Sequence, residues 1–180
     1  DGTFYFETKC WIPEHAFENA HKTTKGIYME AIKDGVLSVT DTRTVDQSKI
    51  EEYIVEKIEA SKNFQAFCYD RTYAGPLISN LIDRNIHVED IKQNPIVMGP
   101  ASTLFETAIL DEKMKHVGYP FLTWQVGCAE RKEYQNDLYA VVKPRNKRER
   151  KIDSLIAGII AMSFAYQVEP KSEFSWFIPE

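Results

Sequence analysis

The chain has 180 residues, of which 43% are hydrophobic and 27% are charged. This composition fits one soluble globular domain with a proper core, and it excludes wholesale disorder. The net charge of −5 argues against general adhesion to nucleic acid, and no apolar run reaches the ~20 residues that a membrane-spanning helix needs. The three cysteines, Cys10, Cys68 and Cys128, lack metal-ligand spacing, so we expect reduced, buried thiols of a cytoplasmic protein.

Strands and helices alternate along the first part of the chain. The expected order is a strand over 3–12, a helix around 29–32, a strand over 36–39, a helix after Asp46, and a short strand over 64–69. Pro13 ends the first strand, and Asp46 is a plausible cap for the amphipathic helix that follows it.

One carboxylate, Asp70, follows directly on the strand over 64–69 and precedes a helix that carries Leu77, Ile78 and Leu81. The order strand, acid, helix is the order of βαβ architectures, which place functional side chains at the carboxyl ends of strands. The alternative is an ordinary turn-forming or helix-capping aspartate.

The second part of the chain ends in an unusually apolar helix. Before it we expect a strand over 87–91, a helix opened by a Thr103–Glu106 capping box, an apolar core stretch over 119–126, and a strand over 138–142. Isoleucines and leucines at helical spacing then predict a buried helix over 151–162. Asp153 lies in its first turn, where the helix dipole favours an acid.

Residues 143–151, here called the basic strip, lead into this last helix. Residues 1–142 carry a balance of −7, whereas the strip carries +5. Its cations are Lys143, Arg145, Lys147, Arg148, Arg150 and Lys151. A carboxylate that enters the core beside six cations would suit a metal site next to a bound phosphodiester backbone, although this stretch alone slightly favours a simpler interpretation. The alternative is a solvated basic loop before a helix-start aspartate.

The order of several short motifs resembles the nuclease domain of phage terminase large subunits, the motor-nucleases that package viral DNA. The motifs are Trp11-Ile12-Pro13-Glu14, residues 35–40, Val45-Asp46, Tyr69-Asp70 before the helix over 77–82, Gln93, residues 116–120 before Trp124, and Lys151-Ile152-Asp153. They extend over nearly the whole chain, so we expect one nuclease domain over residues 1–180.

The resemblance implies an α/β, RNase H-like fold: a mixed central sheet flanked by helices. It also implies cleavage of double-stranded DNA with two divalent cations, Mg²⁺ or Mn²⁺, which prefer carboxylate and water oxygens. Carried over by position, Asp70 and Asp153 are catalytic metal ligands. We expect five cations of the strip to hold the DNA backbone: Lys143, Arg145, Lys147, Arg148 and Lys151.

The third acid of the family lies on a first strand that has no counterpart here. Asp1 resembles part of a turn, Asp41 is no motif acid, and Cys128 stands near where relatives tend to have Asn. The upstream ATPase domain of the family has no counterpart either, since no phosphate-binding Gly-rich loop occurs. We therefore expect a nuclease domain without its first strand, whose longer form works in the host cytoplasm with the small terminase subunit and the portal.

Two other functions stay open. Another RNase H-like nuclease, of the resolvase or integrase type, would use the same acids on a different DNA substrate. A non-catalytic DNA-binding or assembly module would use Asp70 and Asp153 only as caps and the basic strip as a phosphate dock.

Overall fold

Short strands alternate with helices in the computed structural model, which describes residues 2–72, 75–135, 138–145 and 149–165. In chain order the elements are β1 (Phe4–Phe6), β2 (Cys10–Pro13), α1 (Glu14–Glu18), α2 (Lys22–Lys33), β3 (Leu37–Thr40), α3 (Gln47–Ala60), β4 (Phe67–Tyr69), α4 (Gly75–Asp83), β5 (Val88–Asp90), α5 (Pro95–Leu110), β6 (Met114–His116), α6 (Pro120–Gly127), β7 (Glu130–Glu133), β8 (Tyr139–Val142) and α7 (Asp153–Ala165). None of the helices in these ranges is long and apolar enough to cross a lipid bilayer.

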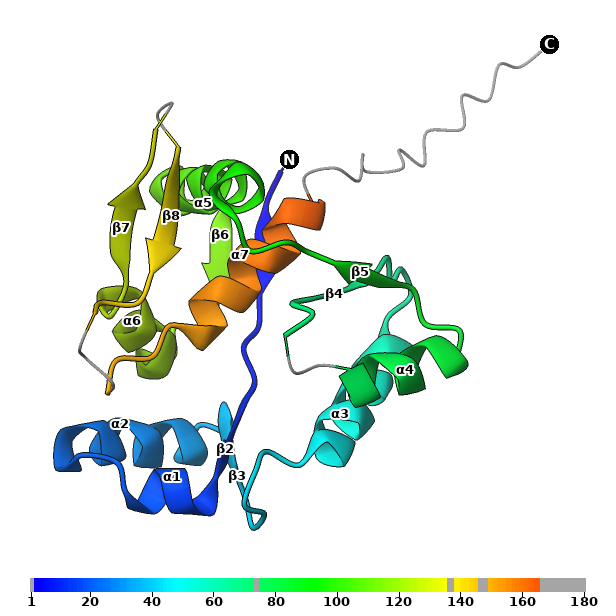
Figure 1. Ribbon diagram of the computed structural model, residues 1–180, viewed down its shortest axis with the longest axis vertical. Helices are drawn as coiled ribbons and strands as arrows, with labels where there is room; N and C mark the ends of the chain where they lie inside the picture. Colours follow the sequence, from blue (N-terminus) through cyan, green and yellow to red (C-terminus); the bar gives the residue numbers. More distant parts are fainter. Residues whose placement is uncertain (1, 73–74, 136–137, 146–148, 166–180) are drawn as a thin grey trace.

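The strands form pairs, most of them parallel (Figure 1). β1 pairs with β6, β2 with β3 and β4 with β5 in parallel, whereas β7 and β8 form an antiparallel hairpin. Parallel neighbours need a crossover of a dozen or more residues, and α1 with α2 provides it between β2 and β3. The mixed α/β class is as expected, but in the described parts of the chain the strands make four separate pairs instead of one continuous sheet.

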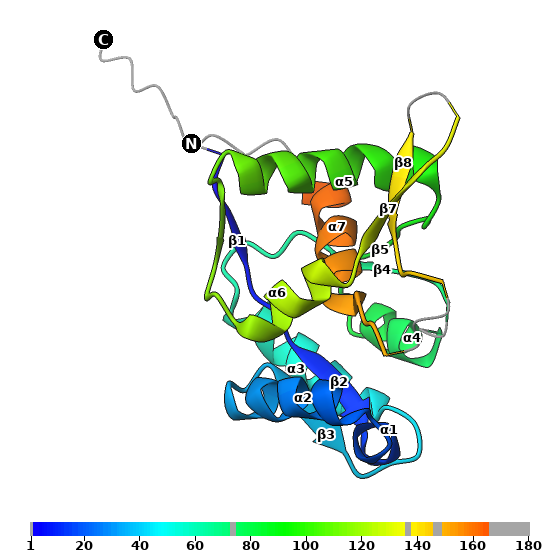
Figure 2. The same ribbon diagram turned by 90° about the vertical axis from the view of Figure 1, so that its left-hand side faces the viewer.

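Helix α7 lies at the centre of the main core. Leu155, Ile159, Ile160 and Met162 pack with the buried face of α5, and Ile159 is only 1% exposed. Figure 2 shows α5 lying across one end of α7. Helix α7 also contacts α6 and β4. The expectation of a buried helix with Asp153 in its first turn is therefore confirmed, although the helix spans Asp153–Ala165 and not 151–162.

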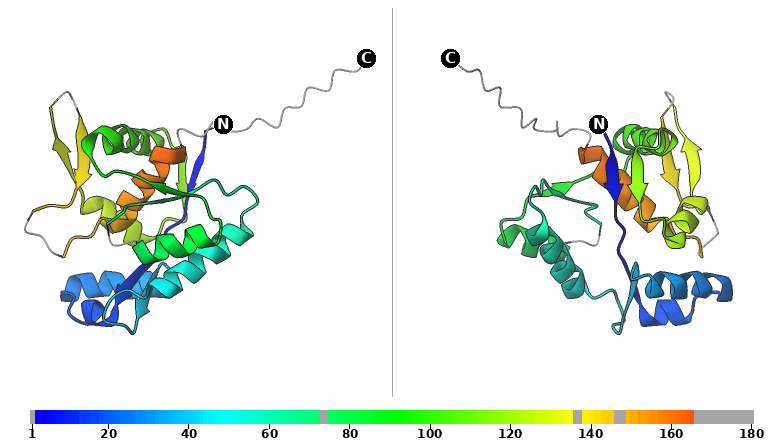
Figure 3. Two further views of the ribbon diagram at one scale, coloured as in Figure 1. Left: turned by 45° about the vertical axis from the view of Figure 1, so that its right-hand side comes forward. Right: turned by 180° about the vertical axis from the view of Figure 1, so that it is seen from behind.

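Two smaller clusters complete the interior. Tyr28, Leu37 and Phe121 join α2, β3 and α6, while Leu77 and Leu81 bring α4 against α3. Between these regions, the amino-terminal segment runs alongside α7 before it reaches α1 (Figure 3).

The prediction that Thr103 and Glu106 form a capping box at the start of a helix is wrong. Helix α5 begins eight residues earlier than this box, at Pro95, and Asn94 caps it by accepting a hydrogen bond from Val97 N at 3.0 Å. Thr103 lies inside the helix, where its hydroxyl donates to the Gly99 carbonyl oxygen. Proline at the first helical position suits a helix start because its missing N–H has no intrahelical partner there.

Candidate functional site

Asp153 faces a cleft of 1120 Å³. The walls of the cleft are residues 5–13, parts of α1, α2 and α6, and the small residues of α7. Two residues of the basic strip, Glu149 and Lys151, also line it. Asp153 is itself exposed, so its carboxylate is accessible at the start of a helix whose leucine and isoleucine face is buried.

The first turn of α7 is fixed by a buried side chain of α6. Gln125 is 1% exposed and makes two hydrogen bonds to Ser154. Its Oε1 accepts from Ser154 N at 2.8 Å, and its Nε2 donates to Ser154 Oγ at 2.9 Å. Ser154 Oγ also lies 3.1 Å from Cys10 Sγ. Because Ser154 N is one of the amides that a helix start leaves without a partner, Gln125 acts as a cap supplied from another helix.

Two ionisable groups beside Asp153 remain neutral near pH 7. Burial raises the pKa of Tyr28 to about 12, and the Asp153 carboxylate adds to this effect. Burial is also the main cause that raises the pKa of the Cys10 thiol, again with a contribution from Asp153. Neither group therefore adds negative charge to this end of the cleft at neutral pH.

Asp70 directly follows β4 and is half-buried. Its Oδ1 accepts hydrogen bonds from Thr72 N and Thr72 Oγ1, each at 3.1 Å, and its Oδ2 accepts one from Gln93 Nε2 at 2.6 Å. The bonds to Thr72 are those of a turn-forming aspartate. Gln93 matched a family position in the sequence, but no local pattern indicated that it contacts Asp70.

Helix α7 packs against β4. The Phe164 ring, near the end of α7, lies 6.2 Å from the His87 ring, which precedes β5. Because β4 and β5 are parallel, the carboxyl end of β4 and the amino end of α7 point toward the same side of the domain. The two predicted acids therefore lie at matching ends of packed elements.

A complete metal-ligand cluster is not present in the part of the chain that the structure describes. No group of three or more His, Cys, Asp or Glu residues lies close enough together there to hold an ion. Asp70 and Asp153 have ligand chemistry suited to Mg²⁺ or Mn²⁺. The kind of donor thus fits, but the number of donors in the described residues is too small.

The basic strip begins at the end of the β7–β8 hairpin. Lys143 and Arg145 are exposed after β8, on either side of the buried Pro144. Lys151 is half-buried and lines the cleft beside Asp153. Two other predicted DNA contacts, Lys147 and Arg148, lie outside the described residues.

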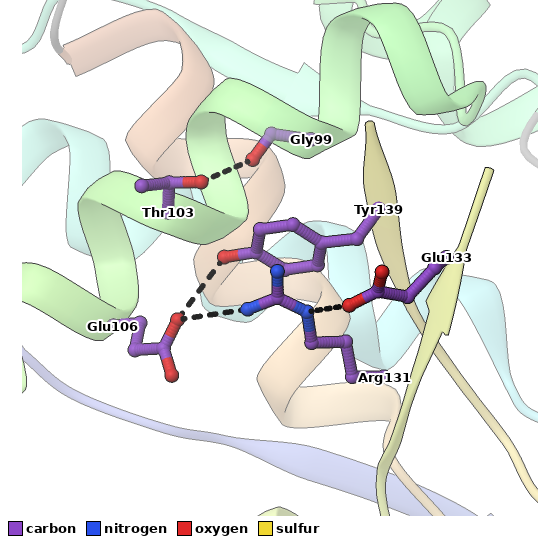
Figure 4. Close-up of polar contacts among 6 residues, drawn as sticks. All are labelled: Gly99, Thr103, Glu106, Arg131, Glu133 and Tyr139. Carbon is purple, nitrogen blue, oxygen red and sulfur yellow. Dashed lines mark hydrogen bonds and ion pairs between the residues drawn. The ribbon is translucent and has the colours of Figure 1, made fainter. Parts of the chain in front are cut away.

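A polar cluster holds this hairpin on α5 (Figure 4). The Tyr139 hydroxyl donates to Glu106 Oε2 at 3.2 Å, and the Arg131 guanidinium lies 3.9 Å from the centre of the Tyr139 ring. Arg131 Nε also donates to Glu133 Oε1 at 3.0 Å. Arg131 and Lys132 of β7 also lie near the strip, because β7 pairs with the strand that leads into it, but no local sequence pattern predicts this.

Two known proteins resemble this chain, one in its sequence and one in its structure. The chain is 29% identical to "Protein YmfN" of Escherichia coli (strain K12), over 96% of this chain and 39% of that protein. The structure of the chain studied here resembles the crystal structure of the HK97 bacteriophage large terminase. The TM-score is 0.72 and the sequence identity is 21%, over 86% of this chain and 32% of the terminase chain. The chain thus spans well under half the length of both proteins.

The structural likeness confirms the expected RNase H-like α/β fold. A family model described as "Terminase large subunit, endonuclease domain" matches residues 1–169, which include β4, α7 and the basic strip. The chain belongs to the family of terminase large subunit endonuclease domains.

Proposed function

We propose that this domain cuts double-stranded DNA with the help of divalent cations, as part of a phage packaging terminase. The observation that carries the proposal is that Asp70 and Asp153 stand at matching ends of β4 and α7, which pack together in a domain of this family. Carboxylates from two distant segments at one end of a packed pair are suited to share a cation.

Asp70 and Asp153 would hold the ions. When bound, two divalent cations would supply an activated water and stabilise the leaving oxygen of the phosphodiester. The chain's own contribution is to orient the ligands: Gln93 and Thr72 fix the Asp70 carboxylate, and the start of α7 fixes Asp153. Ligands oriented in this way bind metal more tightly than mobile ones.

A further strand, from outside residues 1–180, would complete the site. In the described residues β1 pairs only with β6, and β4 pairs only with β5. A second cleft, of 370 Å³, lies between Lys9, Trp11, the Tyr53 face of α3 and Phe67 of β4. Unpaired strand edges beside apolar clefts are an aggregation hazard. We propose that a strand upstream of residue 1 lies between these edges and brings the third carboxylate.

The basic strip would hold the DNA backbone without reading bases. Lys143 and Arg145 are exposed on the hairpin side, while Lys151 lies in the cleft beside Asp153. Cations that reach phosphates add affinity for every sequence alike. Lys147 and Arg148 would extend this track.

In the longer protein, we propose an upstream ATPase domain, with the small terminase subunit and the portal as partners in the host cytoplasm. A resolvase-type nuclease with the same acids would instead prefer branched DNA. A non-catalytic module is favoured by one observation: three hydrogen bonds already engage the Asp70 carboxylate, as in a structural turn.

Plasmid nicking with Mn²⁺ tests the proposal in the longer protein. Asp70→Asn and Asp153→Asn should each abolish nicking and leave the circular dichroism spectrum unchanged, because both changes keep the side-chain volume. Asp83→Asn, an exposed acid at the end of α4, is the matched control and should retain activity. Full activity in either of the first two variants would refute the assignment.

The comparison of this 180-residue chain with a form extended upstream tests the proposed strand. An extension of about one strand, ~5–10 residues, should raise Mn²⁺-dependent nicking strongly. Full activity of the 180-residue chain alone would show that the third ligand lies within residues 1–180. A crystal soaked with Mn²⁺ would distinguish the non-catalytic module, which predicts no metal between Asp70 and Asp153.

A further inference from the structure

We infer that Gln125 is a positioning residue for the metal ligand Asp153, acting through the main chain of Ser154. The inference rests on the proposed function, because it takes Asp153 to be a metal ligand. It adds an uncharged residue of α6, Gln125, which also borders the cleft that Asp153 faces.

The burial of Gln125 is the first argument. An amide side chain costs free energy when it is removed from water unless it is hydrogen-bonded. Gln125 is 1% exposed, beside the buried Phe121 and Leu122 of the same helix. Both ends of its amide are paired with one residue, Ser154, which is 4% exposed. The pair therefore links α6 to α7 at one defined point.

The position of that point is the second argument. Ser154 follows Asp153 directly, and the first turn of α7 includes the bond from Ile156 N to Ile152 O at 2.9 Å. Gln125 Oε1 thus holds an amide that the helix itself leaves open. Fixing Ser154 N fixes the peptide plane between Asp153 and Ser154, and hence the direction in which the Asp153 side chain leaves the helix.

The third argument is that Ser154 joins three elements. Its hydroxyl accepts from Gln125 Nε2 and lies 3.1 Å from Cys10 Sγ on β2. Helix α6, helix α7 and the amino-terminal strand segment therefore meet one residue from the acid. Groups that hydrogen-bond a metal ligand directly typically contribute about 10–100-fold to metal affinity, and we expect an effect within this range for a group that holds the main chain beside the ligand.

The test measures Mn²⁺ affinity by calorimetry in the full-length protein. Gln125→Met keeps the approximate volume of the side chain and removes both hydrogen bonds to Ser154, so it should weaken Mn²⁺ binding by about 10–100-fold. Asp46→Ala is the matched control: it removes a comparable helix cap, the Asp46 Oδ1 bond to Ser48 N at 3.0 Å in α3, and should leave Mn²⁺ affinity unchanged.

Ser154→Ala separates the two hydrogen bonds. It removes the hydroxyl but keeps the bond from Ser154 N to Gln125, so it should weaken Mn²⁺ binding much less than Gln125→Met. Equal losses in both variants would overturn the inference, because the main-chain bond would then not be what orients Asp153.

A measurement on the unaltered protein covers the case in which Gln125→Met does not fold. Coupling between two sites is reciprocal: if the Gln125–Ser154 hydrogen bond strengthens metal binding, metal binding strengthens that hydrogen bond by the same factor. Saturating Mg²⁺ should therefore slow hydrogen exchange of the Ser154 amide by about the same 10–100-fold. The capped Ser48 amide of α3 should not change. An unchanged Ser154 exchange rate would overturn the inference.

Asp153→Asn distinguishes the two possible failures. If it weakens Mn²⁺ binding and Gln125→Met does not, the positioning role is wrong and the metal site stands. If Asp153→Asn leaves Mn²⁺ affinity unchanged, the metal assignment fails and the role of Gln125 fails with it.

Discussion

Two glycines lie inside helices in opposite surroundings. A Cβ atom on Gly158, in α7, would lie 2.8 Å from the Phe6 ring and 2.9 Å from Phe105 Cε2, whereas a Cβ atom on Gly26, in α2, would meet nothing within 4 Å. The substitutions Gly158→Ala and Gly26→Ala therefore share the gain in helix propensity and differ only in packing.

The magnitudes follow from these contacts. Replacing a glycine inside a helix by alanine gains about 1 kcal/mol, so Gly26→Ala should raise the free energy of unfolding by about that amount. Carbon atoms normally lie about 3.5–4.0 Å apart, and Phe105 is only 5% exposed and packs edge-to-face on Phe6 at 5.8 Å. Overpacking of this kind costs about 1–3 kcal/mol, so Gly158→Ala should be destabilising by about 1 kcal/mol net.

Urea unfolding followed by circular dichroism measures both changes. Adding Phe6→Leu to the Gly158→Ala variant should recover stability relative to the sum of the single changes, because the smaller side chain leaves room for the methyl group. The coupling expected for residues in contact is about 0.5–3 kcal/mol. Equal stabilisation by the two glycine substitutions would refute the packing of Phe6 and Phe105 on α7.

Three further predictions concern charge. The double change Lys143→Gln with Arg145→Gln should weaken binding to all DNA sequences alike and reduce the slope of log affinity against log salt by about 2; an unchanged slope would mean that neither cation contacts phosphate. Burial, and then the Glu89 carboxylate, raises the pKa of the Cys68 thiol to about 11, so disulfide-exchange reagents at pH 8 should label Cys68 on the order of a hundredfold more slowly than free cysteine. A hydrogen bond to a main-chain carbonyl, and then Glu89, raises the pKa of His87, so Glu89→Gln should lower the pKa measured by NMR titration, and an unchanged pKa would contradict the 2.9 Å contact between the two side chains.

Local signals in the sequence predict the elements that depend on local physics. The isoleucine spacing identifies α7 as buried, and Asp46 is observed as the cap of α3. The strand over 64–69 is shorter in the structure, as β4, but Asp70 still follows it directly. Each of these features is encoded within one or two helical turns or a few strand residues.

Contacts between distant segments could not be predicted in this way. The stretch over 119–126 is apolar and predicts only a core position, although it forms most of α6 and carries Gln125. The partner of Gln125 is Ser154, which lies 29 residues further along the chain, and no periodic pattern relates the two. The start of α5 was misplaced because a threonine and a glutamate with capping spacing can also occur inside a helix, where Thr103 bonds the Gly99 carbonyl.

The turn-forming and the metal-binding interpretations of Asp70 are compatible. An ionised carboxylate has about four positions that accept a hydrogen bond or a ligand, and Asp70 uses two on Oδ1 and one on Oδ2. One position on Oδ2 is therefore left by these bonds for a cation. The bonds to Thr72 and Gln93 also hold the carboxylate in one orientation, which lowers the entropy that an incoming ion must remove. A turn of this kind is thus a suitable way to present a ligand at the end of β4, just as the Gln125 cap presents Asp153 at the start of α7.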